Sequence, residues 1–204
     1  MTDQPTDPGS TTPAPHMRTE EEIQAFSVDI LKPLTGPITF VEYDPAWPAL
    51  FEREAARIRS ILGDRVIRLE HTGSTSVPGL AAKPIIDITM VVPDSSDEPA
   101  YAADLEAAGY KLVIREPDWF EHRVFKGPDT NINLHVYSPG CQEIDRMVGF
   151  RDWLRTHDDD RELYERTKRE LASQTWAYVQ NYADAKTEVV EAIVSRASLP
   201  PRVD

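Results

Sequence analysis

The residues whose types suit chemistry gather first in two neighbouring stretches of the sequence. Glu70 and His71 run into a turn that holds Gly73 and Ser74, and Asp87 follows between two isoleucines. Glycine lets a backbone approach a ligand closely, and nearby N–H and hydroxyl groups can point at phosphate oxygens. A carboxylate in an apolar strand needs a partner, and a divalent cation is one. We expect a phosphate-binding turn beside a metal-binding Asp87; the alternative is an aspartate that caps a neighbouring loop through hydrogen bonds.

A second polar group comes from two strand-like stretches, HRVFK and NINLHVY. Alternate side chains of a strand share one face, so His122 lies with Lys126, and Asn133 lies with His135. Paired as antiparallel strands, the two stretches would bring these four side chains close to the acid of the first group. Arg123 has the opposite parity and points away from this face unless a bulge re-aims it.

These two groups supply the candidate site residues. The candidate catalytic residues are Glu70, Asp87 and His135, with Asp87 and Glu70 as metal ligands, and the candidate nucleotide- or phosphate-binding residues are His71, Gly73, Ser74, Ser76, Lys83, His122, Arg123 and Lys126. Glu70 fits a metal ligand or a general base, and Lys83 fits a point charge for phosphate. The lysine and histidine candidates have ordinary alternatives. A loop lysine is commonly solvated, and a lone histidine pairs readily with local groups.

Further cationic residues occur in the last third of the chain. Arg151 and Arg155 lie four positions apart and therefore on one face of a helix, where they either face solvent or close a pocket over a ligand. Tyr178 and Tyr182 are expected to make core contacts, and Lys186 is a weaker ligand candidate.

Hydrophobic periodicity predicts the elements that position these residues. The predicted strands are 38–43, 66–70, 85–92, 110–114, 122–126 and 131–137, and the predicted helices are 18–26, 45–62, 101–108, 141–156, 159–182 and 184–197. Asp44 fits an N-cap, and Gly63 and Gly109 fit helix ends. Strands mixed with helices, followed by helices alone, indicate an α+β fold with a C-terminal helical segment.

Composition bounds the function classes. The 204 residues carry a net charge of −13 and one cysteine. This charge disfavours nucleic-acid and anionic-membrane partners, while leaving room for a local basic pocket. No apolar run is long enough for a membrane span and no secretory signal is visible, so the expected compartment is the cytoplasm. The oligomeric state is not indicated.

The chain divides into unequal parts. Residues 1–17 are rich in Thr and Pro and are expected to be disordered, and 18–37 form a short helix and linker. One domain is expected over 38–197, with an α/β core at 38–140 and a helical part at 141–197. A tail follows at 198–204.

The Gly-Ser turn with a nearby strand acid resembles the nucleotidyltransferase superfamily, and the chain more specifically resembles the GrpB family. The resemblance rests on VEYDPAWPALFEREAARI, on EHTGSTSVPGLAAKPIIDI, on the HRVFK and NLHV pair and on FRDWLR, from about 38 to 197. It implies a nucleotidyltransferase-like mixed sheet flanked by helices, with a nucleotide and Mg²⁺ at the Gly73-Ser74 turn. Related domains also occur fused to dephospho-coenzyme A kinase, but the kinase phosphate-loop motif is missing from this sequence.

The sequence departs from the superfamily's acidic pattern. Thr89 stands where a second strand acid is expected, and the third acid's strand carries Asn131, Asn133 and His135. Three interpretations stay open. In the first, one Mg²⁺ is held by few protein ligands. In the second, histidine ligands favour Mn or Zn instead. In the third, binding persists without catalysis.

Three functions are therefore weighed. The first is Mg²⁺-dependent transfer of a nucleoside monophosphate from a nucleoside triphosphate to a small polar acceptor. The second is a non-catalytic module that binds a nucleotide or another phosphorylated ligand. The third and weaker one is a metal-dependent hydrolase built on the histidine cluster and Asp87.

Overall fold

The chain is seen in a computed structural model, which describes residues 16–203. Within them, five strands form one sheet in the order β1-β2-β5-β4-β3. The strands are β1 (Arg68–Thr72), β2 (Ile86–Val91), β3 (Lys111–Glu116), β4 (His122–Lys126) and β5 (Ile132–Tyr137). The β2–β5 pair is parallel and the other neighbours are antiparallel, so the sheet is mixed.

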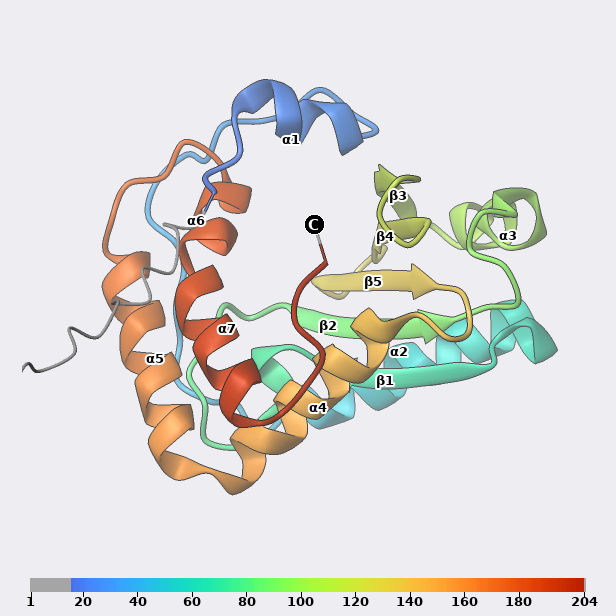
Figure 1. Cartoon of the computed structure of the whole chain (residues 1–204). Coiled ribbons are helices and arrows are strands. Elements are labelled where there is room, and N and C mark those ends of the chain that lie inside the picture. Colours follow the sequence, from blue (N-terminus) through green and yellow to red (C-terminus); the bar gives the residue numbers. More distant parts are fainter. Residues whose placement is uncertain (1–15, 204) are drawn as a thin grey trace, which may run out of the picture.

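Helices surround this sheet, and the last four follow one another at the C-terminal end. The helices are α1 (Glu20–Phe26), α2 (Trp47–Leu62), α3 (Ala102–Ala107), α4 (Gln142–Thr156), α5 (Asp158–Ala172), α6 (Val179–Ala185) and α7 (Thr187–Arg196). Figure 1 shows α5 beside α7, with α4 running from them along the sheet. The α+β fold with a C-terminal helical segment is confirmed.

The two faces of the sheet differ in chemistry because side chains alternate along each strand. Ile88 and Met90 of β2 and Leu134 of β5 are fully buried, and they join Ile58 and Leu62 of α2 in the main core. The residues between them on β2 and β5 are polar and point to the other face. That face lies toward α4, which contacts β1. Asp87, Thr89, Asn133 and His135 therefore share the side of the sheet opposite α2.

The strand predicted at 38–43 is wrong. The structure gives this segment a single β-bridge, between Val41 and Ala82. Ile38 is buried against Tyr182, and Phe40 packs beside it in the same small cluster. The apolar side chains that indicated a strand are thus used to dock the segment onto the C-terminal helices.

The start of α2 differs from the prediction. Ala46 is the N-cap and Pro48 lies in the first turn. Asp44 accepts a hydrogen bond from the backbone N–H of Ala46 at 2.8 Å, which makes a turn before the helix. The other end is as predicted, because Gly63 terminates α2 with a φ of 57°.

The long helix predicted over 159–182 is two helices. The first, α5, ends at Ala172, and α6 begins at Val179. The Trp176 indole donates to the carbonyl of Leu171 at 2.7 Å, and the Ser173 hydroxyl donates to the carbonyl of Glu170 at 2.7 Å. These side-chain bonds satisfy carbonyls at the end of α5 and let the chain turn.

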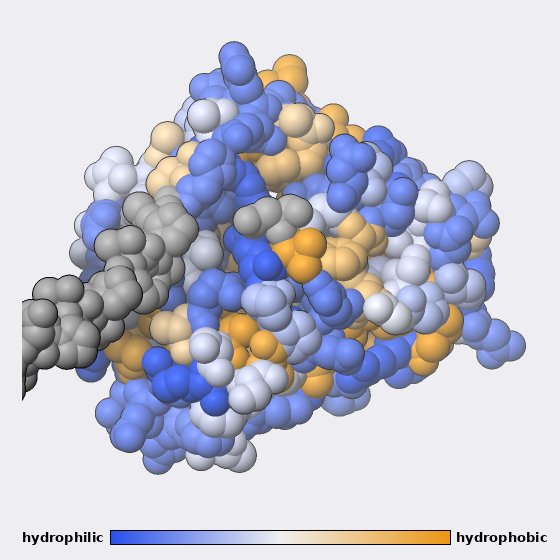
Figure 2. All heavy atoms as spheres, in the orientation of Figure 1, coloured by the Kyte–Doolittle hydropathy of each residue, from blue (hydrophilic) through white to orange (hydrophobic). Residues whose placement is uncertain are grey.

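Three smaller findings complete the fold. The first strand is shifted by two residues, so His71 and Thr72 belong to β1 instead of to the turn. The disorder predicted at 1–17 falls mainly on 1–15, outside the described residues, and the domain boundaries stay predictions. No helix in residues 16–203 has the length and apolar character required to cross a membrane. Figure 2 shows a largely hydrophilic outer surface in one view.

Candidate functional site

The polar face of the sheet opens into a cavity of about 380 Å³ between β2, β5 and the C-terminal helices. Its acidic and basic lining residues are Lys83, Asp87, His135, Arg146, Arg151, Lys168 and Lys186. In the described part of the chain, this lining holds one carboxylate against three lysines and two arginines. A protein with a strongly negative net charge thus has a cationic cavity.

The turn after β1 forms one wall of the cavity. Gly73 has a φ of 67°, which glycine adopts without strain. A Cβ on this residue would collide with the Oδ2 atom of Asp87. The predicted glycine is therefore required for two reasons, its backbone conformation and the close approach of Asp87.

The three lysines line the cavity from separate parts of the chain, and one of them reaches the turn. Lys168 of α5 is 2% exposed, and its ammonium group donates to Ser74 Oγ at 3.0 Å and to the Ala81 carbonyl at 2.7 Å. Lys83 and Lys186 lie over the ring of Tyr182, at 5.2 and 4.8 Å from its centre. No carboxylate oxygen of the described residues lies within 4.0 Å of these three amino groups, so a bound anion would not compete with a carboxylate for them.

Burial disfavours the protonated, charged form of these lysines. Burial, together with the positive charge of Lys186, lowers the pKa of Lys168 to about 6 and that of Lys83 to about 8. The pKa of Lys186 is also lowered by burial. A bound anion would relieve this penalty, because it favours the charged form of each lysine.

The arginines have other partners. Arg146 donates to Glu143 at 3.0 Å and to Glu191 at 2.5 Å. Arg151 donates to Glu70 at 2.7 Å and to the His71 carbonyl at 2.9 Å. These contacts neutralise the arginines, and the cationic character of the cavity rests on the lysines.

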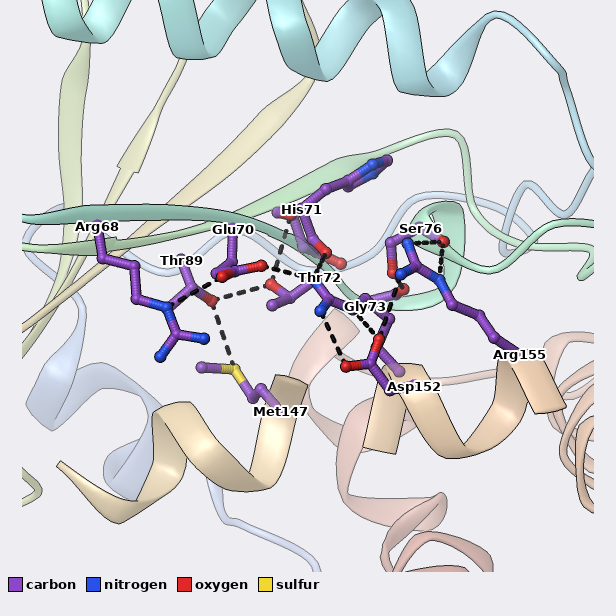
Figure 3. Close-up of polar contacts among 12 residues, drawn as sticks. Arg68, Glu70, His71, Thr72, Gly73, Ser76, Thr89, Met147, Asp152 and Arg155 are labelled. Atoms are coloured by element: carbon purple, nitrogen blue, oxygen red, sulfur yellow. Dashed lines mark hydrogen bonds and ion pairs between the residues drawn. The ribbon is translucent and has the colours of Figure 1, made fainter. Parts of the chain in front are cut away.

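Helix α4 holds the turn in place through its arginines. Arg155 donates two hydrogen bonds to the Ser76 carbonyl, at 2.8 and 3.1 Å, and Figure 3 shows it reaching from α4 toward that residue. Arg151 likewise donates a hydrogen bond to the carbonyl of His71, at the end of β1. The arginine pair thus fastens the turn to the helix, while Arg151 also lines the cavity and Arg155 is exposed.

Asp87 is the acidic centre of the cavity. Its Oδ1 atom accepts a hydrogen bond from Asn133 at 2.7 Å, and His135 Nε2 lies 3.8 Å away. Lys126 in turn donates to the amide oxygen of Asn133. Burial favours protonated Asp87, but His135, Asn133 and Lys83 outweigh it and lower its pKa. The strand geometry thus brings Asn133 and His135 beside Asp87, whereas the other two side chains of the predicted face, Lys126 and His122, contact Asn133 and His135 instead.

Thr89 occupies the place expected for a second acid, and it is fully buried. Its hydroxyl pairs with that of Thr72 at 2.9 Å and contacts Met147 (Figure 3). Glu70 is held by Arg151 and by Arg68, and these contacts lower its pKa although partial burial opposes the change. Glu70 does not line the cavity.

This donor set does not fit a two-metal site. Among residues 16–203, no group of three or more His, Cys, Asp and Glu side chains is arranged to hold a metal ion. Magnesium prefers several oxygen ligands, whereas Asp87 is one carboxylate among lysines. The predicted magnesium stays a prediction.

Two predicted phosphate ligands have structural roles instead. His71 is buried, stacks on Phe51 with ring centres 4.9 Å apart and contacts Thr75 Oγ1 at 3.1 Å. Burial lowers its pKa to about 4. Ser76 donates its hydroxyl to the Gly73 carbonyl at 2.5 Å and so closes the turn. Neither residue lines the cavity.

The remaining predictions divide by strand face. Arg123 points to the opposite side of β4 and donates to Glu98 at 2.6 Å, so the structure does not bring it to the cavity. His122 lies behind His135 on the cavity side, at 3.0 Å. The sequence prediction missed Lys168, because a lysine on a helix carries no signal that it will reach Ser74, 94 residues away.

Comparison with known proteins identifies the family. Residues 37–196 match the family described as GrpB protein. The chain belongs to the GrpB family. A UPF0157 protein of Halalkalibacterium halodurans is 62% identical over 181 residues, covering 89% of this chain and 93% of that protein.

A solved structure of the family agrees on the fold. The conserved protein GrpB from Enterococcus faecalis is 32% identical and aligns with a TM-score of 0.68, covering 78% of this chain and 96% of that one. The Cid1 poly(U) polymerase bound to MgGTP aligns with a TM-score of 0.37 at 12% identity, covering 70% of this chain and 50% of that one. That likeness is too weak to carry an argument. The GrpB match contains the whole sheet and all three cavity lysines, whereas α1 precedes it.

Proposed function

We propose that this GrpB-family chain binds a small phosphorylated ligand, of the nucleotide class, in the cavity beside the Gly73-Ser74 turn. The observation that carries the proposal is the convergence of Lys83, Lys168 and Lys186 on a cavity lined by one carboxylate. Ammonium groups are well suited to phosphate oxygens, and charged hydrogen bonds in a buried setting are strong.

The cavity lining also supports a ligand with an apolar or aromatic portion. Phe150, Leu154, Tyr182 and Val190 belong to this lining, and Lys83 and Lys186 lie over the ring of Tyr182. A cavity lined by convergent polar groups and by apolar side chains fits a ligand that carries both kinds of surface. A nucleoside di- or triphosphate is such a ligand, because its phosphates are anionic and its base is a flat, largely apolar ring.

Nucleotidyl transfer to a small polar acceptor is the finer activity that the family resemblance suggests. The fully buried Thr89 in place of a second acid speaks against the two-metal form of that reaction. The geometry therefore favours ligand binding over metal-dependent transfer or hydrolysis as the basic property of the site.

Isothermal titration of the full chain with ATP and with inorganic pyrophosphate tests this proposal. Wild-type protein should bind both. Lys168→Met and Lys186→Met should each weaken ATP binding by about 10- to 100-fold, because a hydrogen bond to a charged group contributes about 1.5–3 kcal/mol.

The matched control is Lys32→Met, the same substitution at an exposed lysine outside the cavity. This variant should bind ATP as the wild type does. Equal losses in all three variants, or no binding of either anion to the wild type, would contradict the proposal.

A further inference from the structure

A line of hydrogen bonds leads from the outer edge of the sheet to the cavity. Glu116 of β3 lies opposite His122 of β4, and its Oε2 atom is 2.7 Å from His122 Nδ1. His122 Nε2 is 3.0 Å from His135 Nδ1 on β5. The remaining nitrogen of His135 faces Asp87, and His135 lines the cavity.

The two imidazole rings are aligned for one in-plane hydrogen bond. Their planes differ by 6° and their centres are 5.2 Å apart. An imidazole nitrogen lies about 1.1 Å from the ring centre, so two such radii and the nitrogen–nitrogen distance account for the separation of the centres. The rings therefore meet edge to edge in a common plane, with the N–H of one directed at the lone pair of the other.

Glu116 sets the direction of these bonds. A carboxylate only accepts hydrogen bonds, so a 2.7 Å contact requires the proton of His122 on Nδ1. Burial lowers the pKa of His122 to about 4, so this ring is neutral at pH 7 and its Nε2 atom carries a lone pair. That lone pair must accept the Nδ1–H of His135. Neutral His135 then has its free lone pair on Nε2, toward the cavity.

The reverse arrangement is unfavourable at the Glu116 end, because it would place the lone pair of His122 Nδ1 against the Glu116 carboxylate at 2.7 Å.

We propose that His135 is the proton acceptor of this site, taking a proton from a hydroxyl or amine of the bound ligand or of its acceptor, with Glu116 and His122 as positioning residues. The proposal rests on the proposed function, because the same cavity must hold the ligand. The O–H or N–H bond of the ligand breaks, its electron pair stays on the ligand, and a new N–H bond forms at His135 Nε2. The resulting imidazolium lies between the Asp87 carboxylate and the lone pair of His122, and both favour its positive charge.

Long-range ¹H–¹⁵N correlation spectra of the histidine side chains, recorded on the full chain, test the inference. The wild-type spectrum should show His135 protonated at Nδ1 and unprotonated at Nε2. Saturating ATP should shift the Nε2 resonance. A wild-type His135 that carries its proton on Nε2, or that does not respond to bound ATP, overturns the proposal.

Two variants isolate the positioning role. His122→Phe removes the acceptor for Nδ1–H, so His135 should change to the Nε2–H form. Tyr137→Phe is the matched control, because Tyr137 stacks on His122 with ring centres 4.7 Å apart but is outside the hydrogen-bonded line. This control should keep the wild-type His135 spectrum. An unchanged His135 in the His122→Phe variant overturns the role of His122, and if that variant does not fold, the wild-type spectrum decides.

The proposed function can fail separately. His122→Phe should still bind inorganic pyrophosphate, because the three lysines remain. Absence of pyrophosphate binding by the wild type contradicts the lysine site, whereas normal binding with the wrong His135 protonation contradicts only the proton acceptor.

Discussion

At the scale of single residues, Gly73 controls where Asp87 can lie. A side chain on Gly73 would meet strain from its positive φ and a collision with the Asp87 carboxylate. Gly79 also has a positive φ, of 78°, but has open space where a Cβ would be. A comparison of the two glycines therefore separates the cost of backbone strain from the cost of a contact with Asp87.

We predict that Gly79→Ala destabilises the chain by about 1–3 kcal/mol, the range for a residue held in a strained conformation. Gly73→Ala should cost more than this and should also weaken ATP binding, because Asp87 must move. Urea unfolding of both variants measures the difference. Equal free energies of unfolding in the two variants would show that the approach of Asp87 to Gly73 has no energetic weight.

The sequence identifies these site residues unevenly. Strand parity was enough to place Asn133 and His135 on the face that carries Asp87, with Lys126 next to Asn133, because alternation along a strand is local. It also predicted that Arg123 points away. It could not find Lys168, since the contact with Ser74 depends on how α5 packs against a distant turn.

At the scale of elements, α4 braces the Gly73-Ser74 turn. Arg155 supplies two hydrogen bonds to one carbonyl of that turn. Within the turn, the amides of Ser76 and Val77 donate to the carbonyls of Gly73 and Ser74, each at 3.2 Å. Loss of the Arg155 hydrogen bonds should therefore reduce the protection of these amides from hydrogen exchange.

We predict that Arg155→Ala accelerates hydrogen exchange of the Ser76 and Val77 amides by about 10-fold, as expected when hydrogen bonds from a charged group are removed. Arg166→Ala, at an exposed position of α5, is the control and should leave the turn unchanged. Equal exchange rates in the two variants would mean that the turn holds itself without α4.

The elements were easier to predict than their packing. The five strands of the sheet and both ends of α4 follow from local patterns. The segment at 38–43 has the composition of a strand, yet its apolar side chains dock on the C-terminal helices. The break between α5 and α6 depends on the indole of Trp176 finding the carbonyl of Leu171. Such side-chain contacts are tertiary and leave no periodic signal.

At the scale of the whole molecule, buried neutral histidines make stability depend on pH. Burial lowers the pKa of both His71 and His122 to about 4. An unfolded histidine titrates near about 6.5. Between these values the unfolded chain binds more protons than the folded chain, so the free energy of unfolding falls as the pH falls from 6.5 toward 4.

The predicted slope is at most about 1.4 kcal/mol per pH unit for each histidine. Urea unfolding at several pH values measures it. His71→Phe keeps a ring for stacking on Phe51 and should reduce the slope. A variant with the wild-type slope would show that His71 is not buried in neutral form.

The central claim concerns charge. We propose that this acidic protein binds a phosphorylated ligand in a cavity lined by lysines whose pKa values are lowered. Lys168, with a pKa of about 6, is mostly neutral at pH 8 in the free protein. The terminal phosphate of ATP is already ionised at that pH, because its second pKa is about 6. Any proton taken up on binding must therefore go to the protein.

Titration calorimetry with ATP at pH 8, in Tris and in HEPES, measures this uptake directly, since the two buffers have different ionisation enthalpies. The account predicts that the wild type takes up protons on binding, that Lys168→Met takes up fewer and that Lys32→Met behaves as the wild type. Binding of ATP without proton uptake, or with the same uptake in Lys168→Met as in the wild type, would contradict it.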